Sequence, residues 1–323
     1  MNTYSQLLDK FNSDLGKVNF GKIPEGLYDP IYYSLKVGGK RIRPVLCIMA
    51  SELFDGKYDN VINAALGLEI FHNFTLLHDD MMDNAVSRRG QPAVHIKWNE
   101  NIALLSGDAM SVISYKYIIQ SPENLKQILD VFSETALQIC EGQQYDMDFE
   151  TEKNVSEQDY LKMINLKTAV LLAAGLKIGA ISAGAKYEDC ENLYKFGQNM
   201  GIAFQLQDDM LDVYGDVQKF GKNIGGDIVA NKKTYLLIKA MELANGETKK
   251  ELEYWLSLKQ FDPQEKINAV KMIYEALDIR KYSVDLMNSY FIKSEEYFDM
   301  VNIAEEKKKY LLDFTESLRT RSF

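Results

Sequence analysis

The sequence predicts an all-α fold, a single bundle of about a dozen or more helices over residues 1–323. Apolar residues recur three and four positions apart through 60–78, 125–140, 161–181 and 193–211, which is the spacing of one helix face. No proline lies between 123 and 262, so this long stretch lacks the residue that most strongly interrupts helices. No segment alternates apolar and polar residues as a half-buried strand would, and no linker or low-complexity segment divides the chain.

Capping residues predict helix starts at three places in the sequence. Ser121-Pro122-Glu123 and Asp262-Pro263 each place a capping side chain before a proline at the first helical position. Ser156 with Asp159 resembles a capping box, in which a side chain at each position bonds the other's backbone N–H. We therefore expect helices to begin at the two prolines and just after Ser156.

Composition narrows the class of protein. Apolar residues make up 46% of the 323 residues, enough for a large core, and the net charge of −10 argues against binding to nucleic acid or anionic membranes. No apolar run is long enough to span a membrane, and the N-terminus carries no signal sequence. Cys47, Cys140 and Cys190 are odd in number and widely spaced, as expected of reduced thiols. We expect a cytoplasmic protein without nucleic-acid or integral-membrane association.

Two acidic stretches have the same form, D-D-x-x-D. They are H-D-D-M-M-D at 78–83 and Q-D-D-M-L-D at 207–212, and each follows an apolar helical run. On a helix the outer aspartates lie one turn apart on one face, where like charges repel and destabilise the helix. Mg²⁺ is usually bound by one or two carboxylates together with substrate phosphates. A solvated acidic surface is the alternative, and the second copy favours a metal site.

Basic elements accompany the acidic ones. G-G-K-R-I-R-P at 38–44 combines glycines with cations at a helix start, where backbone N–H groups also favour anions. Arg88-Arg89-Gly90 reads as a loop with paired guanidiniums suited to phosphate. His72 lies seven residues before Asp79, about 20° away around the helix, and is either a core residue or a ligand. Solvated surface cations remain the alternative for both basic segments.

Further motifs follow in a fixed order. E-G-Q-Q-Y-D at 141–146 contains Gly142, whose place inside a helix indicates a close helix approach or a nearby ligand. K-T at 167–168, F-Q-L-Q-D-D-M-L-D at 204–212 and G-K-N-I-G-G-D at 221–227 complete the set. Together with 38–44 and 78–90, this ordered set resembles the trans-isoprenyl diphosphate synthases, the polyprenyl synthetase family, over roughly residues 38–234.

The resemblance implies a fold and a reaction. Helices of the isoprenoid synthase type surround a central cavity, and an allylic diphosphate (dimethylallyl, geranyl or farnesyl) binds between the two aspartate motifs through Mg²⁺, typically three ions. The diphosphate leaves, the double bond of isopentenyl diphosphate attacks the allylic cation, and loss of a proton gives a chain five carbons longer. Metal is needed because a like-charge pair at ~4 Å costs roughly 4 kcal/mol even at an effective dielectric constant of about 20.

The resemblance also implies residue roles. Direct metal ligands would be Asp79, Asp83 and Asp208. Further ligands, direct or through water, would be Asp80, Asp146, Asp209 and Asp212. The allylic diphosphate would be held by Arg88, Lys167, Lys222 and Lys232. Isopentenyl diphosphate would be held by Lys40, Arg43, His72 and Arg89. Oxygens near the cation would come from Thr168 and Gln205, which join Asp79, Asp83, Asp208 and Lys167 as the catalytic set. Lys232 departs from the family pattern, because Ala230 stands where an acidic residue is common.

Product length is implied by residues just before the first motif. In the family a bulky side chain four or five positions before the first aspartate blocks the pocket, and here these are Thr75 and Phe74. One aromatic without a two-residue insertion resembles short-chain enzymes that make farnesyl or geranylgeranyl diphosphate, and we favour the twenty-carbon product. Helix geometry alone would not choose Phe74, which lies about 140° around the helix from Asp79.

Two rival interpretations stay open. A class I terpene cyclase shares the all-α fold and one D-D-x-x-D, but lacks a second aspartate motif and the basic elements at 38–44 and 88–90. A non-catalytic partner subunit of the family would usually have lost one aspartate motif, and both are intact here. The resemblance also implies a homodimer formed through helices.

Overall fold

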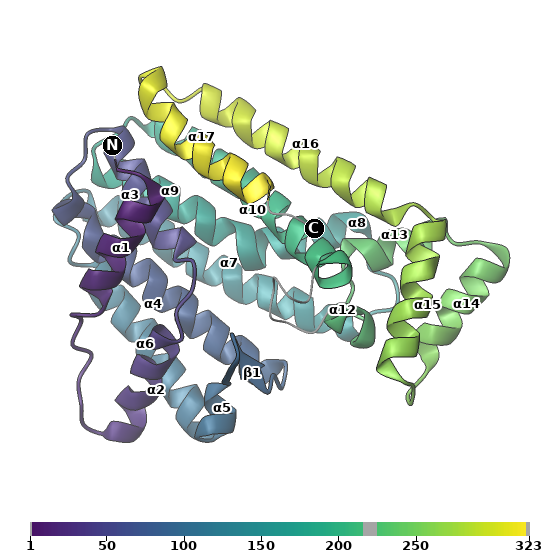
Figure 1. The fold of residues 1–323 in the computed structure, drawn as a ribbon. Helices are drawn as coiled ribbons and strands as arrows, with labels where there is room; N and C mark the ends of the chain where they lie inside the picture. The colour runs from purple at the N-terminus through teal and green to yellow at the C-terminus, as the bar shows by residue number, and fades with distance from the viewer. Residues whose placement is uncertain (1, 216–224, 321–323) are drawn as a thin grey trace. The chain divides into compact units, whose positions relative to one another are not determined.

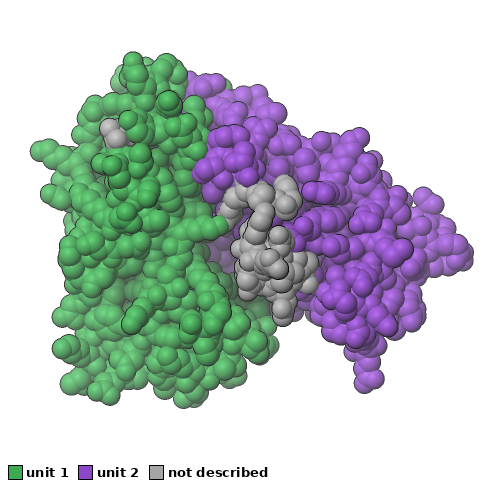
Figure 2. Space-filling view, in the orientation of Figure 1, with its two compact units in different colours: residues 1–135, 171–194, 300–314 green, residues 136–170, 195–299, 315–323 purple. Residues whose placement is uncertain are grey.

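The computed structural model describes residues 2–215 and 225–320 (Figure 1). Its contacts divide the chain into two compact units, coloured in Figure 2. Unit 1 comprises residues 1–135, 171–194 and 300–314, and unit 2 comprises 136–170, 195–299 and 315–323. Helices α7 (Leu125–Thr151), α9 (Val170–Ser182), α10 (Tyr187–Tyr214) and α17 (Glu305–Arg319) contribute to both. The single domain expected over 1–323 stays a prediction.

Unit 1 is built mainly from the N-terminal helices. Its complete elements are α1 (Tyr4–Leu15), α2 (Glu25–Lys36), α3 (Ile42–Leu53), α4 (Tyr58–Met82), β1 (Ser87–Arg88), β2 (Gln91–Pro92), α5 (Val94–Lys97) and α6 (Glu100–Ile118). Helix α3 is buried around most of its circumference, as a central helix should be. Helix α6 packs closely on α4, where a Cβ at Gly67 would lie 2.8 Å from Ile118 Cγ1 and one at Gly107 only 2.2 Å from His78 Nε2. Small residues therefore allow the helix approach that holds the first aspartate motif.

Unit 2 is built mainly from the helices that follow. Its complete elements are α8 (Glu157–Ile164), η1 (Asn165–Ala169), α12 (Gly226–Val229), α13 (Tyr235–Leu243), α14 (Gly246–Ser257), α15 (Pro263–Ala276) and α16 (Ile279–Asp299). Phe196 of α10 stacks on Phe298 of α16 with ring centroids 4.9 Å apart, and both rings are fully buried. The element η1 is one turn of π-helix between α8 and α9, and such turns are frequent at functional sites.

The all-α prediction is confirmed, with one small exception. Strands β1 and β2 pair antiparallel over two residues each, with Ser87 opposite Pro92 and Arg88 opposite Gln91. The turn between them uses Arg89 at φ 53° and Gly90 at φ 73°, the left-handed conformation that two-residue hairpin turns require. Strands of two residues are too short to show an alternation of apolar and polar residues in the sequence.

Two of the expected helix starts are confirmed and one is wrong. The capping box of Ser156 and Asp159 is present, and Pro263 is the first residue of α15 behind the Asp262 cap. Helix α7 instead begins at Leu125, not at the proline three positions earlier. Asn124 takes a left-handed φ of 52°, and its side-chain amide donates to Ile181 O at 2.9 Å. That long-range bond interrupts the helix predicted from local capping.

Contrary to the expectation that no apolar run is long enough to span a membrane, one stretch in the part of the chain that the structure describes, Glu157–Ser182, meets that test by length and composition. Of its most apolar window, 72% is buried inside the protein. Burial of that kind is typical of a core helix, and the π-turn within the stretch carries the polar pair Lys167 and Thr168.

Candidate active site

The first aspartate motif ends α4. Asp79 lies in the last turn, and Asp83, the residue that caps the helix, donates its backbone N–H to Asp79 O at 2.9 Å. Asp80 is buried, with 4% of its surface exposed. The two outer carboxylates therefore lie one turn apart, as the D-D-x-x-D spacing predicts.

The hairpin β1–β2 supplies the partner of Asp80. Arg88 Nε lies 2.8 Å from both carboxylate oxygens of Asp80, and Arg88 Nη2 lies 2.6 Å from Oδ1. A guanidinium presents several donors in a rigid plane, so this contact fixes the orientation of both side chains. The cation expected to bind an allylic diphosphate is thus positioned by the middle aspartate of the first motif.

Arg41, in the basic segment 38–44, turns inward. It adopts a left-handed φ of 51° before α3, and its guanidinium donates to Glu69 Oε1 and to Leu35 O, each at 2.5 Å. Asn73 Nδ2 donates to the same Glu69 oxygen at 2.8 Å. The sequence reasoning gave Arg41 no role. An acidic residue within the apolar stretch 64–71 of α4 was the signal that could have indicated a buried cation.

Arg43, by contrast, faces His72. Arg43 Nη1 lies 3.1 Å from His72 Nε2, and because a guanidinium only donates, that ring nitrogen must accept. Burial, and then the positive charge of Arg43 and Arg89, holds the pKa of His72 well below its ordinary value. His72 is therefore a neutral imidazole that orients a cation.

The β1–β2 hairpin contacts the basic segment 38–44 at Gly39. A Cβ at Gly39, where φ is 142°, would lie 2.6 Å from Arg89 Nη1. Only glycine allows the guanidinium to lie so close to the backbone. Three of the four residues expected to hold isopentenyl diphosphate, Arg43, His72 and Arg89, thus gather in unit 1, and Lys40 lies exposed on the same turn.

The two candidates for setting product length differ in their surroundings. The Phe74 ring packs against Phe71 and His78, with ring centroids 5.3 Å and 4.8 Å apart. Thr75 is engaged locally, since its hydroxyl donates to His72 O at 2.8 Å. The bulky group that could close a hydrocarbon pocket is therefore Phe74.

Unit 2 brings a second set of charges together around Asp146. Lys167 Nζ lies 2.5 Å from Asp146 Oδ2, and Lys232 Nζ lies 3.7 Å from the same oxygen. Burial alone would raise the pKa of Asp146, but Lys232 and Lys167 outweigh it and lower the pKa. A Cβ at Gly142 would lie 2.3 Å from Lys167 N, so glycine allows α7 to approach the π-turn.

The second motif carries a hydrogen-bonded chain. The Thr168 hydroxyl donates to Gln205 Oε1 at 2.9 Å, and Gln205 Nε2 donates to Asp209 Oδ1 at 2.8 Å. The buried Tyr160 hydroxyl donates to the other Asp209 oxygen at 2.5 Å. Burial raises the pKa of Asp209 to about 6 despite these donors. The middle aspartate of this motif is therefore held rigidly by its neighbours, as Asp80 is in the first.

Asp212, the last aspartate of the motif, caps α12. Asp227 N donates to Asp212 Oδ2 at 3.0 Å, and Gly225 N donates to Asp212 O at 2.7 Å. Burial, and then the charges of Asp209 and Asp212, raises the pKa of Asp227 to about 7. Asp227 closes the glycine-rich motif, and the sequence reasoning gave it no separate role.

The structure thus places most of the predicted residues in two charged clusters, one in each unit. In unit 1 lie Lys40, Arg43, His72, Asp79, Asp80, Asp83, Arg88 and Arg89. In unit 2 lie Asp146, Lys167, Thr168, Gln205, Asp208, Asp209, Asp212 and Lys232. Lys222 lies outside the described residues. Within the described ranges, no three His, Cys, Asp or Glu side chains converge closely enough to hold a metal ion by themselves.

The chain is similar to known proteins in both sequence and structure. The family model described as polyprenyl synthetase matches residues 24–277. A geranylgeranyl diphosphate synthase of Sulfolobus acidocaldarius is 34% identical over 97% of this chain and 97% of its own. A solved geranylgeranyl pyrophosphate synthase matches with a TM-score of 0.95 and 44% identity over 100% of both chains. The structure of a geranylgeranyl pyrophosphate synthase from Corynebacterium glutamicum, complexed with isoprenyl diphosphate and magnesium, has a TM-score of 0.84 and 25% identity over 99% of this chain and 96% of its own.

Proposed function

This chain belongs to the polyprenyl synthetase family and is a prenyltransferase, and on that premise we propose that it condenses isopentenyl diphosphate with an allylic diphosphate to make geranylgeranyl diphosphate. The observation that carries the proposal is the pair of aspartate motifs, the first beside Arg88 and the second near Lys232, cations that suit a diphosphate. The relatives named for geranylgeranyl diphosphate support the product.

We propose that Mg²⁺, typically three ions, links the aspartates to the allylic diphosphate. The donor set fits, because carboxylate oxygens are the hard ligands that Mg²⁺ prefers. It also fits that neither cluster forms a complete cage, since Mg²⁺ usually takes one or two carboxylates and completes its shell with phosphate and water. The raised pKa values of Asp209 and Asp227 reflect negative charge gathered in a buried place, which a cation would relieve. When bound, the metal supplies Lewis-acid stabilisation of the leaving diphosphate.

Asp79, Asp83 and Asp208 are the proposed direct ligands, on the match of their motifs to those of the family. Asp80 is held by Arg88, Asp209 by Tyr160 and Gln205, and Asp212 by the α12 backbone. With Asp146, they take the role of further ligands, directly or through water. The Asp146 carboxylate also lies close to the ammonium groups of both Lys167 and Lys232.

Arg88, Lys167 and Lys232 hold the allylic diphosphate in this proposal, together with Lys222, which lies outside the described residues. Thr168 and Gln205 present oxygens toward the developing cation, and their mutual hydrogen bond keeps both side chains in place. The released diphosphate accepts the proton that isopentenyl diphosphate loses.

Lys40, Arg43 and Arg89 bind isopentenyl diphosphate with His72. The neutral imidazole adds no charge of its own, and its lone pair fixes Arg43. The contact of Arg89 with Gly39 and the effect of both Arg43 and Arg89 on His72 support this grouping. Two separate basic groups agree with two diphosphate substrates, which a terpene cyclase does not need.

We propose a homodimer in which α6 contacts a second copy of the chain. Leu105 and Val112 of α6 and Ile119, which caps the helix, lie seven residues apart and hence on one side, and they are 61%, 62% and 51% exposed. Leu104 beside them is 49% exposed. An apolar stripe of this kind on one helix is typical of a buried interface. A cytoplasmic location is part of the proposal and is supported by the three cysteines, all of them free thiols.

The proposal is tested by product analysis. The purified chain is incubated with Mg²⁺, labelled isopentenyl diphosphate and either dimethylallyl, geranyl or farnesyl diphosphate. We expect a labelled twenty-carbon diphosphate as the main product. Product from allylic diphosphate alone would instead indicate a cyclase, and a chain inactive on every primer would indicate a non-catalytic subunit.

A further inference from the structure

Helix α12 is a single turn held at both ends by two consecutive residues of α15. At its N-terminal end, Gly225 has a φ of 84°, and a Cβ there would lie 2.7 Å from Ile267 Cδ1. At its C-terminal end, Lys266 Nζ donates to Val229 O at 3.3 Å and to Asn231 Oδ1 at 2.6 Å. The turn that follows the second aspartate motif is therefore fixed to α15.

The burial of Lys266 is unusual for a lysine. Its side chain is fully buried, with 0% of its surface exposed, and its ammonium also lies 4.2 Å from the centroid of the Phe261 ring. The two oxygen acceptors and the ring are neutral, so they offset the desolvation of the charge only in part. The role of the buried ammonium is therefore to hold Val229 and Asn231 in place through its two hydrogen bonds.

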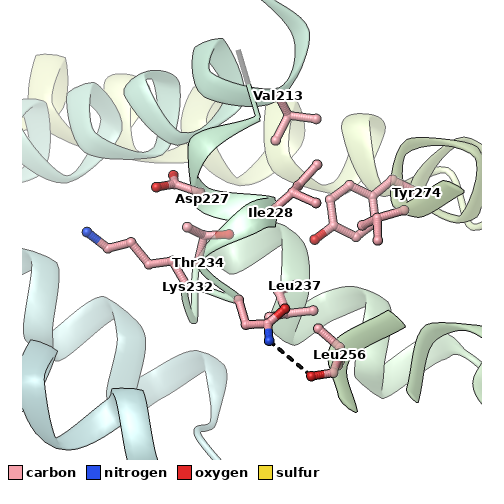
Figure 3. Close-up of a pocket in the computed structure, with 10 residues that line it drawn as sticks. Val213, Asp227, Ile228, Lys232, Thr234, Leu237, Leu256 and Tyr274 are labelled. Atoms are coloured by element: carbon pink, nitrogen blue, oxygen red, sulfur yellow. Dashed lines mark hydrogen bonds between the residues drawn. The ribbon is translucent and has the colours of Figure 1, made fainter. Parts of the chain in front are cut away.

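Asn231 is the residue that Lys266 holds. It has a left-handed φ of 55°, a conformation that asparagine adopts more readily than most residues. Its amide oxygen accepts from Lys266, and its amide nitrogen donates to Leu256 O at 3.0 Å, the dashed line in Figure 3. One side chain thus joins the turn to α15 and to the end of α14.

The turn carries two charged groups. Lys232 follows Asn231 directly, and its backbone N–H donates to Asp227 O at 2.9 Å. Figure 3 shows the side chains of Asp227 and Lys232 pointing away from Tyr274 and Leu256. On that side Lys232 Nζ approaches Asp146. The direction of the Lys232 side chain depends on the backbone of the turn, which Asn231 and Lys266 determine.

We propose that Lys266, acting through Asn231, is a positioning residue that fixes the turn after α12 so that Lys232 meets the allylic diphosphate. This proposal rests on the proposed function, because it assigns the diphosphate of the allylic substrate to Lys232. In this chain the Lys266–Asn231 bond supplies the order of the turn.

The test compares Lys266→Met, Asn231→Gly and the double variant with the wild type. Methionine keeps the length of the buried side chain without its charge, and glycine keeps the left-handed backbone without the amide. We expect each single variant to raise KM for the allylic diphosphate about tenfold, the effect of one hydrogen bond to a charged group. KM for isopentenyl diphosphate and kcat should stay within about twofold, and the double variant should be no worse than the singles.

Lys259→Met is the matched control, because Lys259 is exposed on the segment before α15 and should change neither KM. The Kd of inorganic diphosphate with Mg²⁺, measured by calorimetry, gives the same comparison without turnover. If either folded single variant keeps the wild-type KM and Kd, the positioning role is wrong. If Lys266→Met fails to fold, Asn231→Gly alone provides the test. Wild-type protein that binds diphosphate but makes no product would instead contradict the proposed function.

Discussion

The guanidinium of Arg41 is buried against the carboxylate of Glu69, with Nη1 and Oε1 2.5 Å apart and the two side chains 4% and 3% exposed. This pair joins the turn before α3 to the middle of α4. It therefore connects the segment that carries Lys40 and Arg43 to the helix that carries His72 and the first aspartate motif.

Arg41→Met should lower the free energy of unfolding by about 3–5 kcal/mol, because it leaves the Glu69 carboxylate buried without a positive charge beside it. The double variant Arg41→Met/Glu69→Leu should regain much of that loss. Urea unfolding of the wild type, both single variants and the double variant measures the difference. A double variant as unstable as the sum of the singles would show that the two side chains do not act as a pair.

Asp79→Ala should lower kcat by on the order of 10³-fold while the fold is kept, since it removes a proposed ligand of the ion that would stabilise the leaving diphosphate. Circular dichroism and thermal unfolding check the fold, and turnover is measured over a range of Mg²⁺ concentrations. Asp148→Ala is the control, because Asp148 is an exposed aspartate outside both motifs. Near-normal turnover of the Asp79 variant would remove the metal role.

Phe74→Ala should lengthen the product beyond that of the wild type, because it removes the ring that packs between Phe71 and His78. Chromatography of the dephosphorylated products measures chain length. Phe20→Ala is the matched control, since Phe20 is also a partly buried ring on the hydrophobic cluster that Phe74 contacts. An unchanged product profile in the Phe74 variant would defeat the assignment.

His72 should make the protein less stable at acidic pH. Its folded-state pKa is lowered, so the unfolded chain binds the proton more readily below the ordinary histidine pKa of about 6.5. The free energy of unfolding should then fall by up to about 1.4 kcal/mol for each pH unit below that value, until the folded-state pKa is reached. His72→Gln should lack this part of the slope in urea titrations between pH 7 and 5. Parallel slopes for variant and wild type would contradict it.

Leu105→Glu/Val112→Glu should halve the molar mass of the particle in light scattering, because two carboxylates would face each other across the proposed α6 contact. Ile292→Glu is the control, since Ile292 is 51% exposed on α16 and lies outside that stripe. An unchanged mass in the α6 variant would place the dimer contact elsewhere.

Local signals predicted much of this structure correctly. The apolar spacing identified the helical class, and the caps at Ser156 and Asp262 marked true helix starts, because a cap satisfies backbone groups within a few residues of itself. Gly142 indicated a close approach, which the backbone of Lys167 makes. The helix start predicted at Pro122 was wrong, because a distant partner determines the backbone conformation there: the Asn124 side chain donates a hydrogen bond to Ile181 O.

The sequence by itself determined the helical class, the two D-D-x-x-D motifs and the family, because each depends on residue types at short, fixed spacings. Only the tertiary structure decided which charges act in pairs. It turned Arg41 inward to Glu69, set Arg88 on Asp80 and buried Lys266 against Asn231. Each of these contacts joins residues from different segments, and side chains of the same type are distinguished only by what the fold brings beside them.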